Sequence, residues 1–171
     1  MLRWTDPACM HDAMIRLRHP TRAAAALALA ALLTACGGGT TDKDAVGIIS
    51  ELAAQGLPAD LTVTYTEEND PNKLLGRPHG YASKAAFTDE RAAVQGAGGE
   101  PGDINLGGGV EVFQDADAAE TRVAYIQNIA KASPMLGEYT YQAGNVVLRI
   151  SKDLPPSDAQ AYETALSKIV Q

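Results

Sequence analysis

The chain has 171 residues, 46% of them hydrophobic, which suits one ordinary domain after removal of a leader and excludes wholesale disorder. Subtracting the four basic and two acidic residues before Cys36 from the totals of 14 and 21 leaves 10 basic and 19 acidic residues, a formal net charge of −9. Because an acidic domain repels phosphates, we expect neither nucleic-acid binding nor membrane contact through a basic patch.

An export signal is predicted at the N-terminus. Arg16, Arg18 and Arg22 precede the apolar run 23–33, which is too short to span a bilayer core of roughly 20 residues. Residues 1–13 fit no export signal, so we expect translation to start at Met14. The leader is thus residues 1–35, and Cys9 is lost with it.

The leader ends in Leu33, Thr34, Ala35 and Cys36, which resembles the lipobox of bacterial lipoprotein signal peptides. The resemblance implies cleavage before Cys36 and a lipid on its sulfur. An ordinary signal followed by a chance cysteine is the alternative. Residues 36–43, with three consecutive glycines, are predicted to be the lipidated cysteine and a flexible tether.

Residues 44–171 are predicted to form one α+β domain. We expect a helix over 41–55, and then a strand over 61–66 with Leu61, Val63 and Tyr65 inward. Residues 73–89 are irregular and become extended near 85–87, and the glycine-rich 95–109 is a loop or a flexibly connected strand pair.

The second half of the domain has clearer signals. A strand is predicted over 110–113 and a helix over 117–132, in which Asp117 and Glu120 form a capping box. A hairpin joins 138–141 to 146–150, and Ser157 caps a last helix over 157–170. Together these elements predict an antiparallel sheet with about three helices on one face.

Two stretches resemble a group of small secreted lipoproteins of Gram-positive, mainly actinobacterial, bacteria whose function is uncharacterised. The first is 70–78 with Tyr81, Ser83, Lys84 and Phe87. The second is 110–113 followed by Arg122, 125–126 and 144–148. The resemblance covers most of 44–170, and it implies a cell-surface setting and no particular activity.

Catalytic and metal sites have little support in the sequence. His79 is the one histidine after Cys36, and it has neither a serine in a nucleophile elbow nor companion zinc ligands. The acidic turn 67–72 offers oxygen ligands for Ca²⁺, but turns collect such residues for backbone reasons. We therefore expect no cofactor and no metal.

Two functional hypotheses follow. The first is a non-enzymatic envelope lipoprotein that binds a protein, peptide or glycan, with Arg77 and Tyr81 together at an accessible edge of the binding site, because the irregular segment 74–81 mixes apolar, aromatic and cationic groups. An internal ion pair for Arg77 and a core position for Tyr81 are the alternative. The second hypothesis is an envelope hydrolase that uses acidic residues such as Glu111 and Asp115.

Overall fold

The computed structural model describes residues 39–93 and 99–171. Five antiparallel strands form one sheet in the order β1-β2-β3-β5-β4. The strands are β1 (Asp60–Thr64), β2 (Ser83–Thr88), β3 (Gly107–Val112), β4 (Tyr139–Ala143) and β5 (Val146–Ile150). The α+β class and the antiparallel sheet are therefore as predicted.

Three long helices pack on this sheet: α1 (Ala45–Ala54), α3 (Ala116–Ala132) and α4 (Pro156–Ile169). Shorter helical segments are α2 (Glu90–Ala93), η1 (Ile104–Leu106) and η2 (Pro134–Leu136). The side chain of Asp44 accepts a hydrogen bond from Gly47 N at the start of α1, and Asp115 accepts one from Ala118 N at the start of α3. Both bonds satisfy amides that a helix end leaves without partners.

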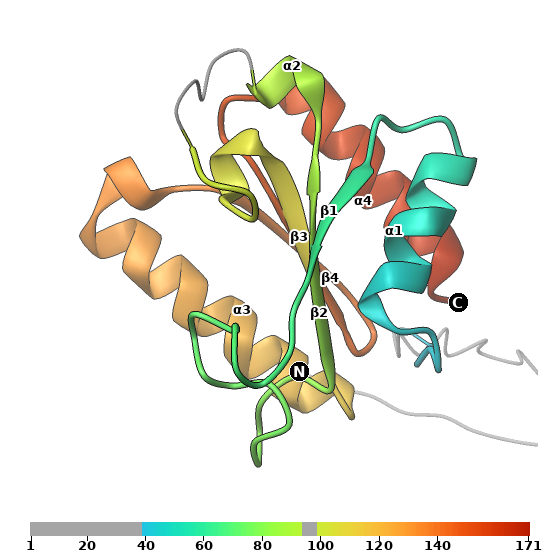
Figure 1. Ribbon diagram of the computed structural model, residues 1–171, viewed down its shortest axis with the longest axis vertical. Helices are drawn as coiled ribbons and strands as arrows, with labels where there is room; N and C mark the ends of the chain where they lie inside the picture. Colours follow the sequence, from blue (N-terminus) through green and yellow to red (C-terminus); the bar gives the residue numbers. More distant parts are fainter. Residues whose placement is uncertain (1–38, 94–98) are drawn as a thin grey trace, which may run out of the picture. The chain divides into compact units, whose positions relative to one another are not determined.

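The helices divide between the two faces of the sheet (Figure 1). The core on one face joins residues of α1 and α4 to one phase of the strands, such as Phe87, Val110 and Leu148. On the other face, Ala119 and Ile126 of α3 pack against Val147. The expectation that all helices share one face is thus wrong in this detail, because a strand pattern shows which residues alternate but does not show what covers the polar phase.

The predicted caps and edges differ from the structure in three places. The α3 cap is Asp115, two residues before the predicted Asp117, and α4 begins after Pro155 without a side-chain cap. Leu61, expected to be inward, is 46% exposed, because β1 is an edge strand and its register with β2 shifts between Leu61 and Val63. Within the described residues no helix has both the length and the apolar character needed to cross a membrane.

The segment before α1 is packed onto the domain. Thr41 N donates to Oδ1 of Asn145, and Nδ2 of Asn145 donates to the Thr41 carbonyl. The flexible tether expected up to residue 43 therefore does not extend over its described part, 39–43. Residues 1–38, which include Cys36 and the lipobox, lie outside the described residues, as do residues 94–98.

Candidate functional site

The face of the sheet under α3 carries charged side chains on three neighbouring strands. Lys84 of β2 lies opposite Glu111 of β3 in the strand register, and Arg149 lies on β5 beside them. The side chains of Lys84 and Glu111 are 8% and 1% exposed. Charges at such positions lose hydration, so their partners decide whether the arrangement is tolerated.

Two arginines and two glutamates form one chain of ion pairs. Arg122 of α3 donates to both carboxylate oxygens of Glu111, with Nε–Oε2 and Nη2–Oε1 distances of 2.7 and 2.9 Å. Arg149 donates to both oxygens of Glu138 at 2.6 and 2.7 Å, and its Nη1 lies 3.4 Å from Oε1 of Glu111. Two-pronged pairs of this kind are among the stronger hydrogen bonds in proteins and fix the orientation of the guanidinium.

Asp70 holds the irregular segment against the sheet. Its carboxylate, fully buried, accepts hydrogen bonds from the Tyr81 hydroxyl at 2.6 and 2.7 Å and from Lys84 Nζ at 3.0 Å. The backbone amides of Leu74 and Leu75 donate to it at 2.8 and 3.2 Å. Asp70 thus ties a loop without regular structure to both β2 and Tyr81.

The environment shifts the pKa values of these three groups. Burial alone raises the pKa of the Asp70 carboxyl, but the bonds from Tyr81, Leu74 and Lys84 outweigh burial and hold it well below its usual 3.8. Burial and the bond to Asp70 raise the pKa of the Tyr81 hydroxyl. Burial lowers the pKa of the Lys84 ammonium, although Asp70 opposes that change.

We call Asp70, Lys84, Glu111, Arg122, Glu138 and Arg149 the ionic floor.

Asn72 connects the two halves of the ionic floor. With its amide oxygen turned toward the cations, it accepts hydrogen bonds from Arg122 Nη2 at 3.1 Å and Lys84 Nζ at 3.2 Å. In the described part of the chain, every buried side-chain nitrogen and oxygen has a hydrogen-bond partner. The charged side chains are therefore fully integrated into the hydrogen-bond network of the fold.

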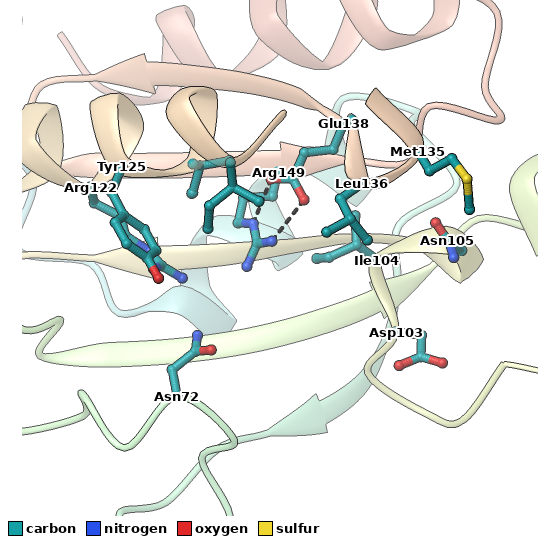
Figure 2. Close-up of a pocket in the computed structure, with 13 residues that line it drawn as sticks. Asn72, Asp103, Ile104, Asn105, Arg122, Tyr125, Met135, Leu136, Glu138 and Arg149 are labelled. Carbon is teal, nitrogen blue, oxygen red and sulfur yellow. Dashed lines mark hydrogen bonds and ion pairs between the residues drawn. The ribbon is translucent and has the colours of Figure 1, made fainter. Parts of the chain in front are cut away.

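A groove lies above the ionic floor. It consists of three cavities of about 360, 180 and 440 Å³, all of which Asn72 lines. Figure 2 shows the cavity of about 360 Å³, in which Arg149, bonded to Glu138, occupies the middle, with Arg122 and Tyr125 on one side and Leu136 on the other. The groove thus places guanidinium, carboxylate and amide groups beside apolar side chains.

Exposed apolar side chains border the groove on the α3 side. Among the described residues, five large hydrophobic side chains are exposed, and four of them line this groove. We call these four the lip: Tyr125, Ile129, Met135 and Leu136, which are 57%, 36%, 83% and 62% exposed. The Arg122 guanidinium lies 5.5 Å from the centre of the Tyr125 ring, so the lip and the ionic floor are in contact.

The structure does not bring Arg77 and Tyr81 together on one surface. Tyr81 is fully buried, where its ring meets that of Phe113 edge to face at 5.9 Å and its hydroxyl bonds to Asp70. Arg77 is exposed on the loop. The hypothesis that Tyr81 is a surface contact is therefore wrong. Its burial depends on the pairing with Asp70, eleven residues earlier, which no short-range pattern indicates.

The other candidates are also placed by the structure. Glu111 is occupied by two arginines, whereas Asp115 is exposed and caps α3, so they do not form a pair of free acids. Asp70, the buried member of the acidic turn, faces hydrogen-bond donors rather than an open cation site. His79 is exposed beside the third cavity with φ at 62°. No group of three or more metal-ligating side chains occurs within the described ranges.

Sequence reasoning missed most of the ionic floor. Lys84, Glu111 and Arg149 occupy the polar phase of their strands, which usually faces water. The available signal is that three such positions carry charges of both signs. The chain matches no family model, and no curated protein or solved structure matches it either.

Proposed function

We propose that the protein is an extracytoplasmic lipoprotein, held to a membrane by lipid on Cys36, whose domain binds a partner in the groove without catalysing a reaction. The sequence supports the anchor through the lipobox resemblance of Leu33, Thr34, Ala35 and Cys36. The domain supports the binding role through the groove between α3 and the loop that contains Asn72.

The observation that carries the binding role is the meeting of the lip with the ionic floor. Buried ion pairs are often less stabilising than apolar residues of similar size, so stability alone gives little reason to keep six charged groups there. Exposed apolar side chains that gather beside a cavity are typical of recognition sites. Both features occur at one place on the domain.

The hydrogen bonds that the buried carboxylates already accept support binding over catalysis. Glu111 and Glu138 each accept hydrogen bonds from arginine, and Asp70 accepts from Tyr81 and Lys84. A general acid or base must exchange its proton with a substrate within hydrogen-bond reach. Carboxylates that are already held by cations serve better to fix arginine donors in place than to transfer protons.

The groove favours a segment of an envelope protein or peptide over a glycan. The lip offers two aliphatic side chains and a methionine beside Tyr125, which suits an apolar side chain of the partner. Arg122 and Asn72 stand next to the lip and can bond to main-chain carbonyls or a carboxylate. The ligand is thus a segment with one apolar anchor and polar groups beside it.

Photo-cross-linking on intact cells tests this proposal. A benzophenone amino acid replaces Tyr125 in the lip, and in the control it replaces Gln160, which is exposed on α4. We expect a discrete adduct from position 125 only, which disappears when Leu136→Ser is added. Equal adducts at both positions would refute the binding role, and an adduct sensitive to glycosidases would identify a glycan instead.

The anchor is tested separately by Cys36→Ala. We expect this variant to leave the membrane fraction or to remain unprocessed, because the sulfur that accepts the lipid is gone. Membrane retention equal to that of the unchanged chain would contradict the lipid anchor. The groove can still be examined in the released protein.

A further inference from the structure

The chain is fixed to the domain only a few residues after Cys36. The amide of Asn145, 4% exposed, bonds to Thr41 at both ends, with Thr41 N–Oδ1 and Nδ2–O distances of 2.9 and 3.1 Å. Nδ2 of Asn145 also donates to the Phe113 carbonyl at 2.8 Å. With these three hydrogen bonds the buried amide satisfies backbone groups of Thr41 and Phe113, and it fixes Thr41 beside the β4–β5 turn.

Close contacts continue back to Gly39. A Cβ on Gly39 would collide with the backbone of Gln171, and a Cβ on Gly144 would collide with the carbonyl of Gly39. Gly144 also has φ at 51°, a conformation that favours glycine. The backbone at Gly39 is therefore pressed between the β4–β5 turn and the end of the described chain.

Contacts also hold the chain between Thr41 and α1. Lys43 N donates to Oγ1 of Thr41 at 3.1 Å, and Ala45 N donates to Oγ of Ser83 at 2.9 Å. In the sequence, only Gly37 and Gly38 separate Cys36 from the packed Gly39. Three residue steps reach at most about 10 Å, which limits how far a lipid on Cys36 can stand from the packed Gly39.

The cavity of about 360 Å³ lies toward the opposite end of the sheet, whereas the third cavity, which Phe113 and Ala118 line, extends back toward the end that holds Thr41. Val112 and Ala143 pair with Val146 near the turn that holds Thr41. Ile104 and Leu136 line the cavity near the other end, where β5 finishes after Arg149. Five residues of strand place these ends roughly 15 Å apart.

We propose that the protein stands on the membrane on the end of its sheet that carries Thr41 and the β4–β5 turn, so that the cavity lined by Ile104 and Leu136 faces away from the bilayer. This inference rests on lipidation of Cys36. Its consequence is that a partner reaches Met135 and Leu136 from the extracytoplasmic side, because the short link keeps this part of the lip from reaching the lipid surface.

Acidic side chains predominate at the end of the sheet that holds Thr41, which we call the tethered end. Asp42, Asp44 and Asp115 are exposed there, with Lys43 among them. Carboxylates do not adhere to anionic headgroups, so electrostatic attraction gives this end no reason to lie on the bilayer. The covalent link alone sets the orientation, and lengthening the link is therefore the decisive change.

Fluorescence quenching in vesicles tests the orientation. The mature chain has no cysteine except Cys36, so a single introduced cysteine is labelled cleanly. The lipidated protein, purified from membranes, enters phosphatidylcholine vesicles with nitroxide headgroups. Labels go to Gln114→Cys and Lys168→Cys near the tether, and to Met135→Cys and Gln160→Cys near the other end. Each pair samples both faces of the sheet.

We expect quenching at positions 114 and 168 and its absence at 135 and 160. Inserting about twenty Gly and Ser residues between Gly38 and Gly39 should abolish this difference, because the longer link lets the domain tumble. Equal quenching at all four positions in the chain without the insertion would overturn the orientation. Failure to float with the vesicles would instead refute the lipid anchor itself.

Discussion

The two faces of the sheet are built from different chemistry. Under α1 and α4 the strands present Phe87, Val110 and Leu148, and the Phe87 ring stacks on that of Tyr162 at 5.5 Å. Under α3 the same strands present Lys84, Glu111 and Arg149. One face gains stability from apolar burial, whereas ion pairs occupy much of the other face.

The difference separates the part of the domain that holds the fold from the part that offers a site. On the apolar face, the Tyr162 hydroxyl donates to the buried Asp89 at 2.9 Å. On the α3 face, apolar packing is confined to a small cluster around Tyr81, Phe113 and Ile126. The groove occupies the area that this small cluster leaves open. Variants on the two faces should therefore fail in different ways.

The largest effect is expected from Glu111→Ala. Removal of this carboxylate leaves Arg122 without its two-pronged partner and Arg149 with Glu138 alone. Loss of one partner from a buried pair typically costs about 3–5 kcal/mol, so we expect the free energy of unfolding to fall by about 4 kcal/mol. Urea denaturation followed by circular dichroism measures this change.

The double variant Glu111→Met with Arg122→Met is the matched control. It removes both charges and keeps similar volume, so we expect most of the stability lost in Glu111→Ala to return. If the ionic floor serves binding, the double variant folds but gives no adduct from position 125. A double variant as unstable as Glu111→Ala would mean that the pair itself holds the domain together.

On the apolar face, Leu148→Ala should be the next most damaging change. Leu148 is fully buried, and its loss leaves a cavity that the sheet cannot close, which costs about 3 kcal/mol. The adduct from position 125 should survive below the melting temperature, because Leu148 faces away from α3. Loss of the adduct in the folded variant would show that the two faces are coupled.

The sequence predicted the apolar face much better than the charged one. The strand-forming residues of 146–150 and the glycine-containing turn before them located the hairpin, because those signals are local. Lys84 and Glu111 meet through strand register, and Arg122 reaches Glu111 from a helix that follows β3. Such pairs depend on which side of the sheet α3 covers, and tertiary packing rather than local preference decides that side.

Lowering the pH should separate the two faces of the sheet less clearly than the substitutions above. The pKa of Asp70 is lowered in the fold despite its burial, chiefly because Tyr81, Leu74 and Lys84 donate to it. A carboxyl with a lowered folded pKa stabilises the fold above its unfolded pKa near 4, and this stabilisation is lost as the pH falls below about 4. We therefore expect a melting temperature that drops steeply below pH 4.

Asp70→Asn should melt lower at pH 7 and lose part of that acid slope. Asp60→Asn, on the exposed edge strand, is the control for removal of one negative charge. Asp89 also has a lowered pKa, because bonds from Arg91 and Tyr162 outweigh its burial, so some acid sensitivity belongs to the apolar face. An acid slope unchanged by Asp70→Asn would assign all of it to groups outside the ionic floor.

The smallest effect on stability, and the sharpest on function, is expected in the lip. Leu136 is 62% exposed, so Leu136→Ser should change the free energy of unfolding by no more than about 0.5 kcal/mol. Leu61 is the matched control, since it is the fifth exposed large hydrophobic side chain of the described residues and lies on β1, outside the groove. If recognition depends on the lip, Leu136→Ser abolishes the adduct from position 125 and Leu61→Ser leaves it intact. Equal adducts in the two variants would mean that the exposed side chains beside the groove are ordinary surface, and the binding role would then depend on the ionic floor alone.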